Sequence, residues 1–459
     1  MLTQALVADA MRRATEGEHL LPAGLAALQE RKLRDLLRLA AGRSPFYTRL
    51  YQGIDLERAP LTDLPPITKE QVQSHFDEVV TDRRVTLDGV RPFCRDSTPA
   101  SNPFYLGEFV VLMSSGTTGH RGYYVWDSAA LADAVAVGYR QSNRGPAGQG
   151  SAGGQRIAAI IQVDPSDATS VLMGLIPESV GSKRLIDIRQ EFPRIVEQLN
   201  EFQPTLLAAY PYMLWLLSEA ARDGRLKVRP RRVTSSADVL TGSDRAAVRA
   251  AFGVEPYNYY CSTEVPYFAW ECDAHDGLHV NADHVLLESV DARNRPVPPG
   301  TLGDKVLVTN LSNRAMPLIR YEMSDQVEWA AAPCPCGCRL PRIRTVAGRV
   351  EHLLTLPGTS EARVGLIEEW VDDIVGRLDS VARYQVIQED PARLTVNVIA
   401  RAGFAWDDVR RSVAGALEQC FRKYGVDATR VRLDLRRVEE LEPVEPGARK
   451  VCRFWSRCR

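Results

Sequence analysis

Residues 192–237 read FPRIVEQLNEFQPTLLAAYPYMLWLLSEAARDGRLKVRPRRVTSSA. Apolar residues recur at helical spacing over 192–202 and 212–224, whereas the short apolar runs at 205–210 and 231–237 have the length of buried strands. Helices that alternate with short buried strands are typical of a parallel sheet covered on both faces. The stretch therefore predicts a doubly wound α/β fold.

The alternation extends in both directions, from about residue 109 to about residue 262. After residue 278 the pattern changes to short strands and turns, which predicts a smaller β subdomain. The last hundred or so residues mix two helical stretches with three strands, which favours a separate α+β domain. We expect a large N-terminal domain over residues 1–348, with mostly parallel sheets plus the β subdomain, and a small domain over 349–459.

The composition indicates an ordinary globular protein of 459 residues, with 45% hydrophobic and 25% charged residues. A net charge of −1 gives no global field that would recruit nucleic acid or an anionic membrane. No apolar run approaches the length of a membrane span, and the amphipathic start lacks the features of a signal peptide. We expect a cytoplasmic protein without nucleic-acid or membrane partners.

The nine cysteines are unevenly spread, which fits a reducing compartment rather than a disulfide framework. Two stretches, ECDAHDGLH (271–279) and CPCGC (334–338), combine thiols with imidazoles. These ligand types suit tetrahedral Zn²⁺, although reduced cysteines in a surface loop would give the same pattern. The side chains concerned are Cys272, His275, His279, Cys334, Cys336 and Cys338.

A loop rich in glycine and hydroxyl residues, SSGTTG, follows the apolar run 109–113. Its exposed amides and hydroxyls can hold a triphosphate, whereas the alternative is a polar turn after a strand. It is not a Walker A loop, because His120 and Arg121 stand where lysine and serine or threonine would follow. The loop consists of Ser114, Ser115, Gly116, Thr117, Thr118 and Gly119.

Further motifs follow the SSGTTG loop along the chain. They are NYYCSTE (258–264), RYEMSD (320–325), AGRVE (347–351) and RKVCRF (449–454). In this order and at these separations they resemble the signatures of the adenylate-forming superfamily, which includes acyl-CoA synthetases and nonribosomal-peptide adenylation domains. Four other stretches resemble the phenylacetate–CoA ligase group: SPFY (44–47), LPPITKE (64–70), VTSSADVL (233–240) and CPCGCRLPRI (334–343).

The resemblance implies a reaction in two steps and a fold that moves between them. ATP and a carboxylate give an acyl-adenylate and pyrophosphate, and a nucleophile, commonly the CoA thiol, then takes the acyl group. Residues 1–348 would form the adenylation core that holds ATP, the acid and zinc. The mobile domain 349–459 would swing about a hinge at Glu351 and carry the catalytic lysine, Lys450.

The resemblance also implies roles for individual residues. The loop 114–119 would cradle the phosphates, Thr263 and Glu264 would hold the α-phosphate and Mg²⁺, and Lys450 would stabilise charge on the α-phosphate. Asp325 would bind the ribose, with support from Arg349. The implied adenine-pocket residues are Ser236, Ala237, Asp238, Asn258, Tyr259 and Tyr260, of which Tyr260 would stack on the base. The implied ligands of a structural zinc are Cys272, His279, Cys334 and Cys336, with His275 and Cys338 as alternatives.

The acyl pocket is the weakest part of the pattern. Aromatic stretches at 210–217 and 259–270 correspond to segments that line this pocket in the family, and flat rings favour an aromatic acid. Ordinary core packing explains the same residues equally well. The pocket candidates are Tyr210, Tyr212, Cys261 and Phe268.

Several motif positions depart from the family pattern. His120-Arg121 replaces Lys-Pro, Cys261 and Ser324 replace glycines, Glu351 replaces the hinge aspartate, and Arg449 replaces the glycine before the catalytic lysine. Together these changes indicate a specialised member, and we expect a role in secondary metabolism.

The sequence thus predicts an AMP-forming ligase for a small aromatic acid, with ATP, Mg²⁺, a structural Zn²⁺ and CoA as the expected acceptor. One alternative keeps the adenylation but not CoA, as in an amide synthetase or an ATP-dependent diazotase that activates nitrite in natural-product biosynthesis. A non-catalytic nucleotide-binding protein is a further alternative. A homodimer is compatible with the sequence.

Overall fold

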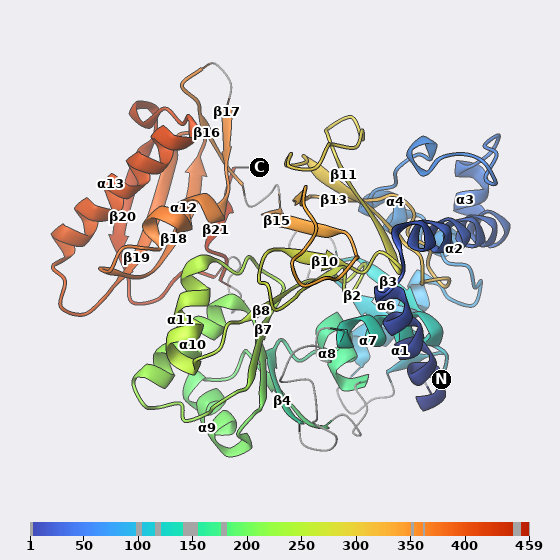
Figure 1. Ribbon diagram of the computed structural model, residues 1–459, viewed down its shortest axis with the longest axis horizontal. Helices are drawn as coiled ribbons and strands as arrows, with labels where there is room; N and C mark the ends of the chain where they lie inside the picture. Colours follow the sequence, from blue (N-terminus) through green and yellow to red (C-terminus); the bar gives the residue numbers. More distant parts are fainter. Residues whose placement is uncertain are drawn as a thin grey trace.

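The computed structural model describes residues 3–97, 103–114, 121–140, 155–175, 181–349, 353–360, 363–443 and 451–458. Figure 1 shows two lobes: an N-terminal lobe from α1 to β15, coloured blue to light orange, and a C-terminal lobe from β16 to β21, coloured orange to red. Within the described residues, no helix combines the length and apolar character needed to cross a membrane.

The N-terminal lobe is built around one large sheet of nine strands in the order β14-β15-β10-β9-β8-β7-β6-β4-β5. Pairings from β5 to β8 are parallel, and those from β8 to β14 are antiparallel. The strands are β4 (Gln155–Ile161), β5 (Gly181–Asp187), β6 (Leu206–Ala209), β7 (Arg232–Ser235), β8 (Tyr257–Tyr260), β9 (Ala269–Glu271), β10 (Leu278–Val280), β14 (Asp325–Trp329) and β15 (Arg342–Arg349).

Helices cover both faces of the parallel part, because its strands are apolar on both sides. In β4, Ala158 and Ile160 pack with α9, α10 and α11, whereas Ile157, Ala159 and Ile161 pack on the opposite face with Met173 of α8. The helices are α7 (Ser128–Tyr139), α8 (Ala168–Leu175), α9 (Phe192–Phe202), α10 (Pro211–Arg222) and α11 (Gly242–Phe252). The predicted doubly wound α/β architecture is confirmed, and within the described large sheet parallel pairing is confined to β4–β8.

Two antiparallel three-stranded sheets complete this lobe, β1-β2-β3 and β11-β12-β13. Two of the short strands expected after residue 278, β10 and β14, belong to the large sheet and not to a separate β subdomain, since β10 pairs with β9 and β14 pairs with β15. The small sheets comprise β1 (Phe104–Tyr105), β2 (Phe109–Met113), β3 (Tyr123–Trp126), β11 (Val285–Val290), β12 (Lys305–Asn310) and β13 (Tyr321–Met323).

The first hundred residues are helical, as the sequence predicts, and α4 begins behind a capping box formed by Thr68 and Gln71. The elements are α1 (Gln4–Glu18), α2 (Pro22–Arg43), α3 (Pro45–Leu50), η1 (Leu61–Asp63), α4 (Lys69–Ser74), α5 (Phe76–Val79) and α6 (Leu87–Asp96).

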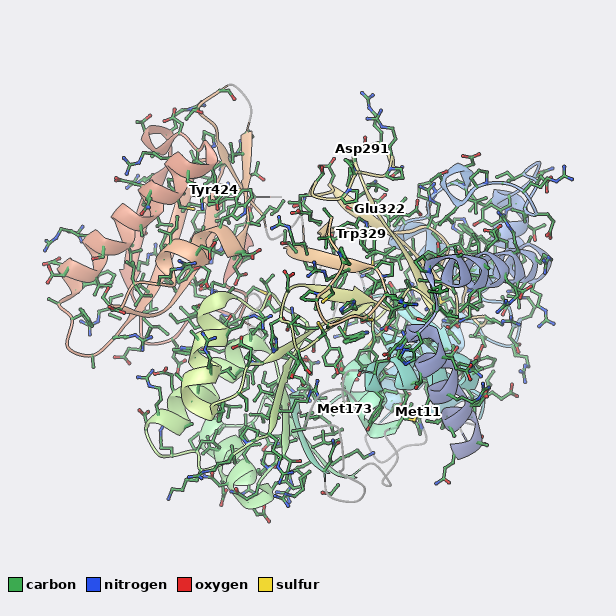
Figure 2. All side chains as sticks on the ribbon, in the orientation of Figure 1. Met11, Met173, Asp291, Glu322, Trp329 and Tyr424 are labelled. Atoms are coloured by element: carbon green, nitrogen blue, oxygen red, sulfur yellow. The ribbon has the colours of Figure 1, made fainter. Side chains whose placement is uncertain are left out.

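The C-terminal lobe has its own apolar core, which runs from Leu354 to Phe454. Its sheet has the order β20-β19-β18-β21 and packs against α12 and α13. Tyr424 lies at the end of α13 (Figure 2), and Trp370 of α12 stacks on it with ring centroids 4.1 Å apart. The elements are β16 (Leu354–Pro357), β17 (Arg363–Leu366), α12 (Glu368–Val375), β18 (Val381–Asp390), β19 (Arg393–Ala400), α13 (Trp406–Tyr424), η4 (Ala428–Arg430), β20 (Arg432–Arg437) and β21 (Phe454–Ser456). This is the predicted α+β pattern; the boundary at residue 348 stays a prediction.

Candidate active site and metal centre

The residues predicted to surround adenine lie at the ends of two neighbouring parallel strands. The segment 236–238 follows β7, and the segment 261–264 follows β8. Ser235, the last residue of β7, is paired in register with Asn258 inside β8. Because carboxyl ends of parallel strands meet at one edge of a sheet, the fold brings both predicted segments together there.

Two buried polar atoms at this edge lack hydrogen-bond partners among the described residues: Oγ of Ser235 and Oδ1 of Asn258. Buried polar groups in folded proteins are nearly always hydrogen-bonded. Next to them, Ala237 has a φ of +69°, a left-handed conformation that is costly for a residue with a Cβ. Unsatisfied atoms and a strained turn at one edge fit a bound ring with hydrogen-bonding groups, such as adenine.

Glu264, the predicted Mg²⁺ ligand, is held by a buried tyrosine. The hydroxyl of Tyr124 donates to Oε1 of Glu264 at 2.9 Å, and its oxygen lies 3.0 Å from the Tyr321 hydroxyl. Burial, with the neighbouring Glu264 carboxylate, raises the pKa of Tyr124 well above its ordinary value, so the phenol stays a donor. Thr263 is half-buried beside this group. The hydrogen bond from Tyr124 in β3 thereby fixes the orientation of the Glu264 carboxylate.

Ser114 is the one member of the predicted phosphate loop that the structure describes; Ser115, Gly116, Thr117, Thr118 and Gly119 lie outside the described residues. The amide of Ser114 donates to the Gly122 carbonyl at 2.9 Å, and the Gly122 amide donates to Ser114 Oγ at 2.7 Å. These bonds join the two ends of the loop at the end of β2.

Lys69 is a residue near this loop that the sequence analysis did not assign to the site. Its ammonium group donates to Ser114 Oγ at 3.3 Å. The segment before it is fixed by backbone bonds, since the Ile67 amide donates to the Arg320 carbonyl and the Glu322 amide donates to the Ile67 carbonyl. Lysine is rare in this chain, and that scarcity was the signal that could have drawn attention to LPPITKE. The loop thus has a neighbouring cation although its own sequence contains none.

Asp325, the predicted ribose ligand, is buried at the start of β14 and lies opposite Arg349 in the β14–β15 register. The side chain of Arg349, the hinge residue Glu351 and the catalytic candidate Lys450 lie outside the described residues. Their roles stay predictions.

The acyl-pocket candidates do not form one group of contacts. Phe268 is fully buried and stacks on Tyr260 with ring centroids 4.8 Å apart. Tyr212 stacks on Trp215, and the guanidinium of Arg383 lies over its ring at 5.4 Å. Tyr210 precedes α10, and burial raises the pKa of the Cys261 thiol. Core packing therefore accounts for Phe268, and Tyr212 lies where the two lobes touch.

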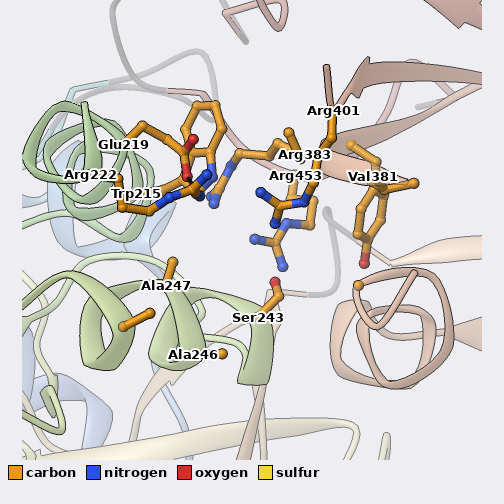
Figure 3. Close-up of a pocket in the computed structure, with 14 residues that line it drawn as sticks. Trp215, Glu219, Arg222, Ser243, Ala246, Ala247, Val381, Arg383, Arg401 and Arg453 are labelled. Carbon is orange, nitrogen blue, oxygen red and sulfur yellow. Dashed lines mark hydrogen bonds and ion pairs between the residues drawn. The ribbon is translucent and has the colours of Figure 1, made fainter. Parts of the chain in front are cut away.

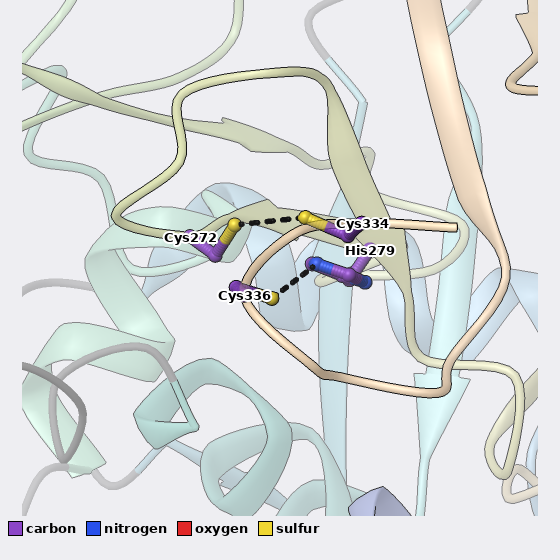
Figure 4. A group of neighbouring side chains, drawn as sticks. All are labelled: Cys272, His279, Cys334 and Cys336. Carbon is purple, nitrogen blue, oxygen red and sulfur yellow. Dashed lines mark hydrogen bonds between the residues drawn. The ribbon is translucent and has the colours of Figure 1, made fainter. Parts of the chain in front are cut away.

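Four predicted zinc ligands come together in the N-terminal lobe, and we call Cys272, His279, Cys334 and Cys336 the Cys/His cluster (Figure 4). Their ligand atoms all lie within 4.8 Å of one another. The Sγ atoms of Cys272 and Cys334 are 3.5 Å apart, and Cys336 Sγ lies 3.3 Å from His279 Nε2. Three thiols and one imidazole at this spacing are a donor set for tetrahedral zinc.

The sheet and one glycine position the cluster. Cys272 follows β9, His279 is in β10, and the loop with Cys334 and Cys336 joins β14 to β15, so antiparallel pairing gathers all of them. Gly277 has a φ of +84°, and a Cβ there would lie 2.2 Å from the Ile343 carbonyl oxygen, so glycine is required.

The histidine orientation also suits a metal. His279 Nδ1 lies 3.3 Å from the Leu340 carbonyl oxygen, and a proton on Nδ1 leaves Nε2 free as a ligand. The alternative ligand His275 lies instead 3.4 Å from Glu271 and 4.8 Å from the Tyr257 ring. Cys338, the other alternative, donates its backbone amide to Cys336 Sγ and is not in the cluster.

Comparison with known proteins agrees with this geometry. No protein-family model matches the chain. The sequence is 28% identical over 368 residues to the phenylacetate-coenzyme A ligase of Thermus thermophilus, covering 73% of each protein. The phenylacetate-coenzyme A ligase of Pseudomonas putida is 27% identical over 248 residues, 52% of this chain and 55% of that protein.

The fold matches solved structures of ligases. The structure of 2-hydroxyisobutyryl-CoA ligase in the postadenylation state, in complex with R3-HIB-AMP, superposes with a TM-score of 0.71 at 16% identity, covering 93% of this chain and 88% of that chain. A mixed α/β sheet in the N-terminal lobe, followed by a C-terminal α+β lobe, is the architecture that the chain shares with this ligase, which binds an acyl-adenylate. In fold the chain is similar to these adenylate-forming ligases, and in sequence it is similar to phenylacetate–CoA ligases.

Proposed function

We propose that the protein is an ATP-dependent, AMP-forming acid–thiol ligase. It activates a small carboxylic acid as an acyl-adenylate and then transfers the acyl group to CoA. The observation that carries this proposal is the edge of the large sheet where the unsatisfied atoms of Ser235 and Asn258 lie beside the segment that ends in Glu264.

Each group at this edge has a defined task in the first step. Glu264, fixed by Tyr124, would hold Mg²⁺ together with Thr263, and the cation would neutralise phosphate charge. Lys69 and the loop 114–119 would bind the leaving pyrophosphate, while Asp325 would bind the ribose. Lys450 would stabilise the developing charge on the α-phosphate from the C-terminal lobe.

The acid and the acceptor are the finer parts of the proposal. The relatives are named for phenylacetate and CoA, and structures of 2-hydroxyisobutyryl-CoA ligase contain an acyl-adenylate with CoA. These names support an acid–CoA ligase. Tyr259 and Tyr267, with ring centroids 5.7 Å apart after β8, support an aromatic acid.

We also propose that the Cys/His cluster holds one structural Zn²⁺. Four protein ligands leave no open position for catalysis. Metal analysis of protein purified without chelators should give one zinc per chain, and a content well below that would contradict the assignment.

Pyrophosphate and AMP release from ATP–Mg²⁺ over a panel of aryl and alkyl acids and nitrite tests the activity. Each substrate is assayed alone, with CoA and with amines. Acid-dependent release that requires CoA for turnover is the expected result. Pyrophosphate release that depends on nitrite or an amine and is independent of CoA would instead identify the diazotase or amide-synthetase chemistry. ATP binding without any release over the panel would contradict the proposed ligase.

A further inference from the structure

A buried group of charged and hydroxyl side chains joins the two lobes. Its centre is Arg453, which is 4% exposed and precedes β21 in the C-terminal lobe. The Arg453 guanidinium donates to Thr241 Oγ1 at 2.6 Å and to Asp244 Oδ1 at 2.9 Å, both in the N-terminal lobe. It also donates to Asp372 Oδ1 of α12 at 2.7 Å.

Two further contacts cross between the lobes at the same place. Asp372 accepts from the Ser243 amide at 3.0 Å and from the Ser243 hydroxyl at 2.8 Å, at the first turn of α11. Arg383 of β18 forms an ion pair with Asp244. We call this set of residues the clasp: Thr241, Ser243, Asp244, Asp372, Arg383 and Arg453.

The charges of the clasp balance. It contains two aspartates and two arginines. Burial alone would raise the pKa of Asp244, but the guanidinium groups of Arg383 and Arg453 hold it below its ordinary value. Burial raises the pKa of the neighbouring Glu368 well above its ordinary value, and its Oε1 lies 3.5 Å from the Arg453 guanidinium.

Apolar side chains do not completely fill the contact between the two lobes beside the clasp. A cavity of about 190 Å³ lies beside the clasp, lined by Arg383 and Arg453 from one lobe and by Ser243, Ala246 and Ala247 from the other (Figure 3). The short alanine side chains leave the space unfilled. The Arg383 guanidinium also lies over the Trp215 ring, 5.2 Å from its centroid, so polar and cation–π contacts together carry the docking of the lobes in this region.

The clasp connects two segments that the proposed function uses. Arg453 lies three residues after Lys450, and the described chain resumes at Val451. Thr241 and Asp244 follow the segment 236–238 that is expected to line the adenine pocket. One side chain thus ties the end of the lysine segment to the start of the helix behind that pocket.

We propose, on the basis of the function above, that Arg453 is a positioning residue that docks the lysine-bearing segment on α11 for the adenylation step. Buried ion pairs gain little net free energy, because desolvation offsets their attraction. When the lobes separate, Asp244 and both arginines return to water together and no charge is left buried alone. The clasp is therefore specific in geometry and reversible, as an enzyme with two successive half-reactions requires.

Separate assays of the two half-reactions test this role. We expect Arg453→Gln to slow acid-dependent ATP–pyrophosphate exchange by roughly 10²-fold, as displacement of a catalytic group does, and to leave acyl transfer from added acyl-adenylate to CoA unchanged. Arg453→Lys should recover part of the exchange rate. Equal losses in both half-reactions, or no loss, would overturn the proposal.

A matched control lies in the same segment. Arg457 bonds to Glu389 at 2.8 Å and to Glu442 at 3.0 Å, both within the C-terminal lobe, so Arg457→Gln should leave exchange unchanged. Asp244→Asn provides a second variant in the other lobe, since its amide oxygen still accepts from Thr241. It should reproduce the Arg453→Gln defect, and a normal exchange rate would contradict the clasp.

A measurement without substrates separates the clasp from the proposed activity. Hydrogen–deuterium exchange should rise in Arg453→Gln over both 241–246 and 368–374, because the Ser243 amide loses its fixed acceptor. Unchanged exchange over both segments would overturn the clasp even in an active ligase. Increased exchange in a protein that shows no ATP chemistry would keep the clasp and reject the ligase assignment.

Discussion

The Cys/His cluster and the clasp both join segments distant in sequence, yet they differ in what holds them. The cluster lies inside one lobe, where pairing of β10 with β9 and β15 fixes its ligands before any ion binds. The clasp lies between lobes, beside a cavity, and relies on charges that water can replace. The first arrangement suits a permanent connection, and the second suits one that opens in each catalytic cycle.

The largest effect is expected from loss of the metal site. Cys334→Ser should abolish zinc binding and lower the free energy of unfolding by several kcal/mol, because metal-binding free energy contributes directly to folding. Zinc content and denaturant unfolding measure both. Cys458→Ser, which changes an exposed cysteine, is the control. A Cys334→Ser protein of unchanged stability would remove the contrast with the clasp.

Lys450→Ala separates chemistry from docking. It should reduce adenylation by at least about 10²-fold, as loss of a single charge-stabilising donor does, while hydrogen–deuterium exchange over α11 stays as in the parent. Lys423→Ala, a surface lysine of α13 stacked on Tyr424, should have no effect. Unchanged ATP turnover in Lys450→Ala would reject its catalytic assignment.

Tyr124→Phe tests the fixed carboxylate within the N-terminal lobe. Loss of its hydrogen bond to Glu264 should raise the Mg²⁺ concentration needed for half-maximal exchange by about tenfold, the size of one hydrogen bond to a charged group. Titration of Mg²⁺ in the exchange assay measures this shift, with Tyr123→Phe as the neighbouring control. Lowered activity at every Mg²⁺ concentration would indicate damage unrelated to the cation.

The smallest effect concerns pH at the clasp. Burial raises the pKa of Glu368 above its ordinary value of 4.5, so its contribution to stability is fully present below pH 4.5 and declines as pH rises through the raised value. Glu368→Gln should therefore flatten the decline in unfolding free energy between pH 4.5 and alkaline pH. Parallel pH profiles of the two proteins would show that Glu368 ionises as freely when buried as in water.

The sequence predicted the parallel half of the large sheet because each strand there is a buried apolar run between amphipathic helices. It did not predict that β10 and β14 join the same sheet. The sequence of a short antiparallel strand does not indicate which strand it pairs with, because tertiary packing determines the pairing.

The candidate site shows the same division. Cysteine and histidine types pointed to six candidate ligands, because few side chains have that ligand chemistry, and the family resemblance implied the four members of the Cys/His cluster. Lys69 was missed because its role depends on the distance to Ser114, which is 45 positions away. Arg453 was noted only as part of a motif, because an ion pair with Asp244 needs both lobes in place.

The unsatisfied atoms of Ser235 and Asn258 bear on which nucleoside triphosphate the edge accepts. A carbonyl oxygen such as Asn258 Oδ1 can accept a hydrogen bond from the exocyclic amine of adenine. It would be repelled by the O6 carbonyl oxygen that guanine carries at the same position. A buried polar atom left facing a like partner costs about 1–3 kcal/mol. With adenine bound at this edge as proposed, selection of ATP over GTP would rest on one amide oxygen that has no hydrogen-bond partner among the described residues.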